Sequence, residues 1–270
     1  MPNNHCLGVT GSRLYRALNA TTQTSSTTIS IAKTSAPGFA FVLQRERLFS
    51  RLDEGAPVTW ISGAAGTGKS MLAASWLSER ERESLWYRVD PEDTSGEVFS
   101  FYLEQAAARH LGRRYRPPSA PVGSRDISAA HARGYFRHLF GLFKKPFALV
   151  LDNFQDAHPG AGFAGLLDDA ITEVPGRGRI VVISRSEPPA ELAHHRAAGR
   201  IHLITANELR FTEPEIQALA ALRGQTVAKQ VIADLHRRSD GWAAGLVLML
   251  EYLRRAALPS ADQSPATPQV

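Results

Sequence analysis

Short apolar runs alternate with longer amphipathic segments from Val58 onward, and this alternation is the main structural signal in the chain. Each run is rich in β-branched or aromatic residues, which favours strands. Nearly continuous apolar strands separated by helices are typical of a parallel sheet covered on both faces. We therefore expect an α/β protein with a doubly wound, five-stranded parallel sheet. The predicted strands are VTWIS (58–62), LWYRV (85–89), FALVL (147–151), IVVIS (180–184) and IHLI (201–204).

Helical patterns replace the strands after Thr212. Three helices are predicted there, at residues 213–223, 227–238 and 242–255. Capping boxes, which mark helix starts, are predicted for Thr94 with Glu97 and for Thr212 with Glu215. The sequence thus divides into a tail (1–32), an α/β domain (33–205), a small helical lid subdomain (206–256) and a second tail (257–270).

The first tail is predicted from composition. No acidic residue precedes Glu46, and the stretch NATTQTSSTTIS is rich in Thr and Ser. Such a segment cannot build a hydrophobic core, so we expect it to be disordered. Transit peptides share this composition, but Arg13 and Arg16 are too few to form a basic amphipathic helix.

Bulk composition narrows the class of protein. With 43% hydrophobic residues, 270 residues can bury a full core, and no apolar run is long enough to span a membrane. We therefore expect a soluble chain without a membrane partner. Cys6 is the sole cysteine, which excludes an internal disulfide framework and suits a reducing cytoplasm. The net charge of +5 favours nucleic-acid binding only weakly, because the basic residues are scattered.

The segment that follows the first strand carries the clearest chemistry. It reads GAAGTGKS and matches the phosphate-loop pattern G-x-x-x-x-G-K-[ST]. Glycines let the backbone N–H groups surround phosphates at a helix N-terminus, the lysine reaches the β- and γ-phosphates, and the serine hydroxyl ligates Mg²⁺. The predicted nucleotide-binding residues here are Gly63, Ala64, Ala65, Gly66, Thr67, Gly68, Lys69, Ser70 and Met71.

Two further strand ends complete the predicted site. In FALVLDN, Asp152 follows a buried strand and is the expected second ligand of Mg²⁺ beside Ser70. The next strand ends in Ser184 and Arg185, and Arg185 is a candidate sensor of the γ-phosphate. We assign Lys69, Asp152 and Arg185 to the catalytic group.

The nucleotide is predicted to be ATP or ADP. The sequence holds no N-K-x-D or T-K-x-D segment of the kind that reads guanine. His194, His195 and His202 lack metal-ligand spacing to any carboxylate or cysteine in the sequence, so we expect them to be solvated.

Taken together, several segments resemble the ATPase module of the large ATP-binding LuxR-type, MalT-like transcription regulators, a branch of the STAND signalling ATPases among the AAA+-related P-loop proteins. The resemblance covers about residues 32–255. The segments that carry it are AKTSAPGFAFVLQRERLFSRL, LWYRVDPEDTSGEVFSFYL, ISRSEPPAELAHHRAAGRI, ELRFTEPE and GWAAGLVLML. It implies a P-loop NTPase fold, with Arg45 and Trp242 near the adenine side and the segment SDGWAAGL capping the nucleotide from the lid.

The chain departs from the family pattern at one strand end. The family commonly shows D-D-x-H where this sequence has Asp152, Asn153, Phe154 and Gln155. Asparagine cannot accept a proton from water, so general-base activation is in doubt; Asp156 is another candidate base. Family members also continue into a winged-helix domain, a sensor of helical repeats and a DNA-binding helix-turn-helix, none of which follows the lid in this sequence.

The resulting hypothesis is an ATP/ADP-binding switch with slow or no intrinsic hydrolysis, at most a weak ATPase. Self-association or a protein partner is expected on ATP binding, and no sequence-specific DNA binding by this chain alone. Two alternatives stay open: an AAA+-like ATPase acting on nucleic acid, of the initiator or loader type, and a degenerate P-loop interaction module.

Overall fold

The computed structural model describes residues 32–38, 42–93, 96–116, 129–157 and 162–256. The predicted tails therefore lie almost wholly outside the described residues, as does Thr94 of the first predicted capping box. None of the described helices is long and apolar enough to cross a lipid bilayer.

Five strands form one parallel sheet, as predicted. They are β1 (Val58–Ser62), β2 (Glu83–Arg88), β3 (Phe147–Asp152), β4 (Gly178–Ser184) and β5 (Ile201–Ile204). Their order across the sheet is β2-β3-β4-β1-β5, so β4 separates β1 from β3. The polar residues Glu83 and Ser84 extend β2 beyond its apolar run, because they pair with Phe147 and Ala148 of β3.

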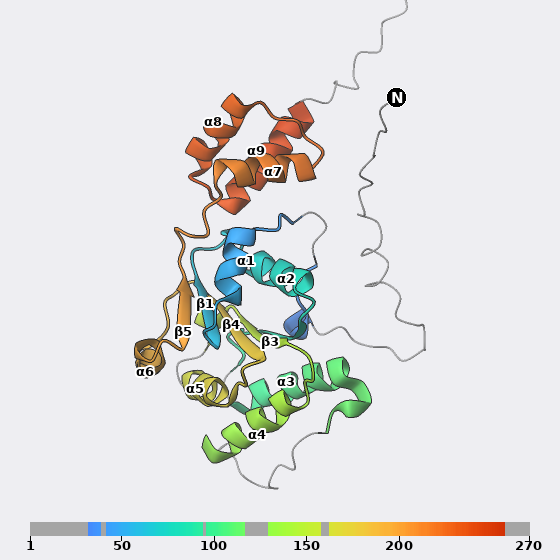
Figure 1. Ribbon diagram of the computed structural model, residues 1–270, viewed down its shortest axis with the longest axis vertical. Helices are drawn as coiled ribbons and strands as arrows, with labels where there is room; N and C mark the ends of the chain where they lie inside the picture. Colours follow the sequence, from blue (N-terminus) through green and yellow to red (C-terminus); the bar gives the residue numbers. More distant parts are fainter. Residues whose placement is uncertain (1–31, 39–41, 94–95, 117–128, 158–161, 257–270) are drawn as a thin grey trace, which may run out of the picture. The chain divides into compact units, whose positions relative to one another are not determined.

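Helices cover both faces of this sheet (Figure 1). Alternate residues of β3 show the two faces, since successive strand side chains point in opposite directions. Ala148 and Val150 pack in one buried cluster with α1 (Glu46–Asp53) and α2 (Lys69–Glu79). Leu149 and Leu151 belong to the other cluster, which includes α3 (Gly96–Leu111), α4 (Ala129–Gly141) and α5 (Phe163–Glu173). The doubly wound architecture is thereby confirmed.

The remaining helices follow β4 and β5. The short helix α6 (Ala193–Ala197) precedes β5, and α7 (Glu213–Leu222), α8 (Lys229–Ser239) and α9 (Ala243–Ala256) follow it. The last three share a hydrophobic cluster of their own, which includes Ile216, Leu235 and Leu246. The capping box predicted at the start of α7 is present: Glu215 N–H donates to Thr212 Oγ1, and Thr212 N–H donates to Glu215 Oε2.

Candidate nucleotide-binding site

The segment GAAGTGKS joins the end of β1 to the start of α2. Gly66 and Gly68 have φ angles of +76° and +85°, in the left-handed region that glycine enters without a steric penalty. Lys69 is the first residue of α2, so the loop ends at the positive end of a helix dipole. A glycine turn that leads into a helix N-terminus is suited to binding phosphate.

The Lys69 side chain folds back onto this loop. Its Nζ donates to the carbonyl oxygens of Gly63 and Ala64, at 2.6 and 2.7 Å. Burial lowers the pKa of Lys69, although the nearby Asp152 carboxylate opposes this effect. The Thr67 hydroxyl donates to the same Ala64 carbonyl at 2.9 Å. These contacts hold the amine beside the loop backbone, where it can meet a bound phosphate.

Ser70 and Asp152 meet across the gap between α2 and β3. Ser70 Oγ donates to Asp152 Oδ1 at 2.9 Å, and Asp152 is 2% exposed. Burial raises the pKa of Asp152 despite the hydrogen bond from Ser70, so its charged form gains from a nearby cation. Neighbouring oxygens around Mg²⁺ also lie about 2.9 Å apart, given its octahedral geometry and metal–oxygen distances of 2.0–2.1 Å. The two side chains therefore fit a magnesium site.

Arg185 lies at the end of β4, on the cavity that adjoins the phosphate loop. This cavity has a volume of about 300 Å³ and is lined by Ala65, Gly66, Gly68, Lys69, Ser70, Met71, Asn153, Gln155 and Arg185. The structure thus brings residues from the ends of β3 and β4 together with the start of α2. The sheet order explains this, because β4 lies directly between β1 and β3.

Gln155 is a site residue that the sequence analysis did not assign. Its Oε1 accepts a hydrogen bond from the Arg185 N–H at 2.9 Å, which joins the end of β3 to the end of β4. Its Nε2 is buried and has no hydrogen-bond partner among the described residues. Asp156, the other candidate base, is not among the residues that line the cavity. The sequence signal for Gln155 was its place in the D-D-x-H pattern, where the family that the chain resembles commonly has histidine.

A second, mostly apolar cavity adjoins the phosphate loop. Its volume is about 490 Å³, and Gly66, Gly68 and Met71 line both cavities. An apolar space that borders the phosphate site suits an adenine base. Of the other lining residues, Arg45 was expected near the adenine side from the resemblance. The rest were not assigned from the sequence, and most come from other segments of the chain: Val42, Leu43, Leu72, Phe211, Leu219, Arg223, Ala243, Ala244, Val247 and Leu248.

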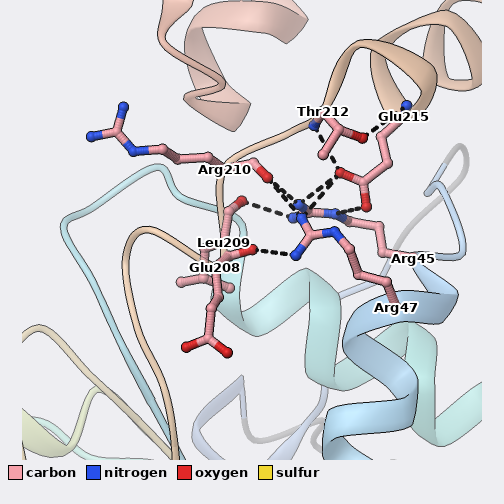
Figure 2. Close-up of polar contacts among 7 residues, drawn as sticks. All are labelled: Arg45, Arg47, Glu208, Leu209, Arg210, Thr212 and Glu215. Atoms are coloured by element: carbon pink, nitrogen blue, oxygen red, sulfur yellow. Dashed lines mark hydrogen bonds and ion pairs between the residues drawn. The ribbon is translucent and has the colours of Figure 1, made fainter.

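Arg45 connects α1 to the segment that begins α7 (Figure 2). Its guanidinium donates to the Leu209 and Arg210 carbonyl oxygens at 2.9 and 2.8 Å and to both carboxylate oxygens of Glu215. It also lies 4.0 Å from the centroid of the Phe211 ring. Burial lowers the pKa of Arg45, but an arginine retains its charge at neutral pH. The residue therefore lines the apolar cavity and also fixes the start of the lid.

Trp242 lies against the phosphate loop. Its Nε1 donates to the Ala65 carbonyl at 3.2 Å, and the Ala244 N–H donates to the Gly66 carbonyl at 3.0 Å. A Cβ atom at Gly66 would lie 2.8 Å from the tryptophan ring, so only glycine fits there. Trp242 lines a third cavity, beside Thr67 and Leu209, and is not among the residues that line the apolar one.

A histidine outside this site departs from expectation. His195 is buried, whereas we expected it to be solvated. His194 Nε2 and His195 Nε2 lie 2.9 and 2.8 Å from Asp168 Oδ1. Asp168 belongs to α5 and is distant in sequence, so no local spacing pattern could have disclosed the cluster.

Comparison with known proteins supports the resemblance. No protein-family model matches the sequence. The HTH-type transcriptional regulator MalT of Serratia proteamaculans is 26% identical over 236 residues, which cover 82% of this chain and 24% of that protein. MalT of Yersinia enterocolitica is 27% identical over 221 residues, or 76% of this chain and 23% of the relative. The chain thus spans about a quarter of the length of these relatives.

A solved structure supports the fold. The crystal structure of a STAND protein with a tetratricopeptide repeat sensor, from Pyrococcus horikoshii, superposes with a TM-score of 0.52 at 19% identity. The match covers 80% of this chain and 31% of the archaeal one. The chain therefore has the fold of a P-loop NTPase, and its sequence is similar to a part of the regulators named MalT.

Proposed function

We propose that the chain binds ATP and ADP with Mg²⁺ and acts as a slowly hydrolysing regulatory switch. One observation carries the proposal: the 2.9 Å hydrogen bond between Ser70 and Asp152, beside a glycine loop that ends at Lys69. This hydrogen bond joins the phosphate loop, through Ser70, to Asp152, the second predicted ligand of Mg²⁺. The similarity to regulators named MalT supports a regulatory role.

Each part of the site has a separate role in this proposal. The backbone N–H groups of the loop and Lys69 bind the phosphates, and Arg185 contacts the γ-phosphate. Ser70 and Asp152 would hold Mg²⁺, which would neutralise phosphate charge. The apolar cavity beside Met71 takes the adenine base.

Slow turnover follows from the groups at the end of β3. Asn153 and Gln155 line the phosphate cavity, and neither can act as a general base. Gln155 instead links the two strand ends, since its Oε1 accepts a hydrogen bond from the Arg185 backbone N–H. The chain would therefore remain in its ATP state until a partner acts on it.

The switch itself would work through the lid. Trp242 and Ala244 hydrogen-bond to the carbonyl groups of Ala65 and Gly66, so the loop that binds phosphate also contacts the lid. A nucleotide can shift a conformational equilibrium only when it contacts the two states differently. Direct contact between the lid and the loop supplies a route for such a difference, and self-association or a protein partner would sense it.

The decisive experiment is calorimetric titration of ATP and ADP, with Mg²⁺, into the wild type and Lys69→Ala. The variant lacks the amine that faces the phosphates, so we expect tight ATP binding to be lost. Lys144→Ala is the matched control, because Lys144 is an exposed lysine that lines none of the three cavities. Unchanged affinity in Lys69→Ala would contradict the proposal. Equal displacement of bound ATP by GTP would contradict the adenine assignment.

A further inference from the structure

We propose that Asp168, His194 and His195 form a Zn²⁺ site that joins α5 to α6. The two imidazole Nε2 atoms lie 2.9 and 2.8 Å from the same carboxylate oxygen, Asp168 Oδ1. This is the one group of three metal-ligating side chains with converging ligand atoms among the residues that the structure describes. None of the three lines a nucleotide-site cavity, so the inference is independent of the proposed function.

The backbone on both sides of the cluster is anchored. Leu192, just before α6, is fully buried in the same hydrophobic cluster as Leu167 and Ile171 of α5. The Arg200 guanidinium donates to the Ile171 carbonyl, and the Arg200 N–H donates to the His195 carbonyl at 2.9 Å. Ligands fixed on packed elements form a more exact metal site than ligands on free loops. The fold therefore holds these side chains together before any metal binds.

The polar groups at the centre of the cluster are poorly satisfied without an ion. His195 Nε2 and Asp168 Oδ1 are buried, and neither has a hydrogen-bond partner with acceptable geometry in the described part of the chain. Buried polar atoms are normally paired, so two adjacent exceptions require an explanation. A cation between the three ligand atoms would satisfy all of them.

The ligand set selects the metal. Two imidazole nitrogens and one carboxylate oxygen suit Zn²⁺, whereas Mg²⁺ and Ca²⁺ prefer oxygen ligands alone. Three protein ligands leave one position of a tetrahedral site for water. Because His194 is exposed and His195 is buried, the cluster reaches the surface, and a metal ion can enter from solvent.

The test is calorimetric titration of zinc chloride into the metal-free chain, with excess Mg²⁺ to saturate any oxygen-ligand site. All variants carry Cys6→Ser, because a free thiol is itself a strong zinc ligand. The Cys6→Ser chain is the parent of the other variants, and we expect it to bind one equivalent of zinc. His194→Ala and Asp168→Asn should each weaken binding by at least about tenfold, since losing even an outer partner of a metal ligand costs 10–100-fold.

His236→Ala is the matched control, because His236 also faces a carboxylate, with Nδ1 4.0 Å from Glu213 Oε1. Zinc should bind this variant as it binds the parent and raise the unfolding temperature of both, with no such rise in His194→Ala. His194 is exposed, so its replacement tests the site without emptying the core. Absence of zinc binding in the parent, or parent-like affinity in His194→Ala, would show that the cluster is only an ion pair.

Discussion

Asn153 follows the proposed metal ligand Asp152 and governs the expected turnover. It has a φ angle of +61°, and its N–H donates to Asp152 Oδ1 at 3.0 Å. Aspartate tolerates this left-handed backbone nearly as well as asparagine, so Asn153→Asp adds a carboxylate with little strain. We expect the variant to raise single-turnover ATP hydrolysis by up to about 10²–10⁴-fold, the usual contribution of a general base. Phosphate release with enzyme in excess over ATP measures the rate.

Gln155 provides the complementary test at the same scale. The Gln155 side chain links Arg185 to the end of β3. We therefore expect Gln155→Ala to lower any residual hydrolysis and to change ATP affinity little. Asp156→Asn is the control, since Asp156 does not line the phosphate cavity. If the wild type already turns over at ordinary rates of about 1–10³ s⁻¹ and Asn153→Asp changes nothing, another residue is the base. Loss of activity in Asp156→Asn would then identify it.

At the scale of elements, the pair of Arg45 and Glu215 ties α1 to α7. Their side chains are 5% and 14% exposed, and the carboxylate also caps α7. Glu215→Gln preserves a capping side chain but leaves the arginine without its counter-charge. We expect a loss of roughly 2–3 kcal/mol in the free energy of unfolding, measured by urea denaturation. Glu213→Gln, two residues earlier and with a side chain that is 45% exposed, should cost much less.

This contribution should also depend on pH. Burial alone would raise the pKa of Glu215, but hydrogen bonds from Arg45 and the Thr212 N–H lower it below the usual 4.5. A lowered pKa in the folded state stabilises the fold above the unfolded pKa, and the benefit disappears as the pH falls through the folded pKa. The difference between the wild type and Glu215→Gln should therefore be complete near neutral pH and shrink below about pH 4.5. A pH-independent difference would contradict this account.

At the scale of the whole molecule, the distribution of charge governs the DNA binding that we expect. The net charge is +5, but several exposed arginines are paired with nearby carboxylates, including Arg254 and Arg255 with Glu251 and Arg237 with Asp234. We expect only weak, sequence-independent binding that falls steeply with salt, because such binding depends on counterion release. Fluorescence anisotropy with two unrelated labelled duplexes across a salt series measures this. A footprint on one defined sequence that persists at physiological salt would favour a nucleic-acid-acting protein.

The sequence alone determined the strands, the phosphate loop and the position of Asp152 at the end of a strand. These features are local, because apolar periodicity and the loop residue types act through neighbours in the chain. Only the tertiary structure decided which distant residues meet. Arg45 pairs with Glu215, Gln155 with Arg185, and Asp168 with His195. Such pairs depend on strand order and helix packing, and no spacing rule encodes them. For the same reason, sequence reasoning expected His195 in solvent, whereas packing against α5 buries it beside a carboxylate.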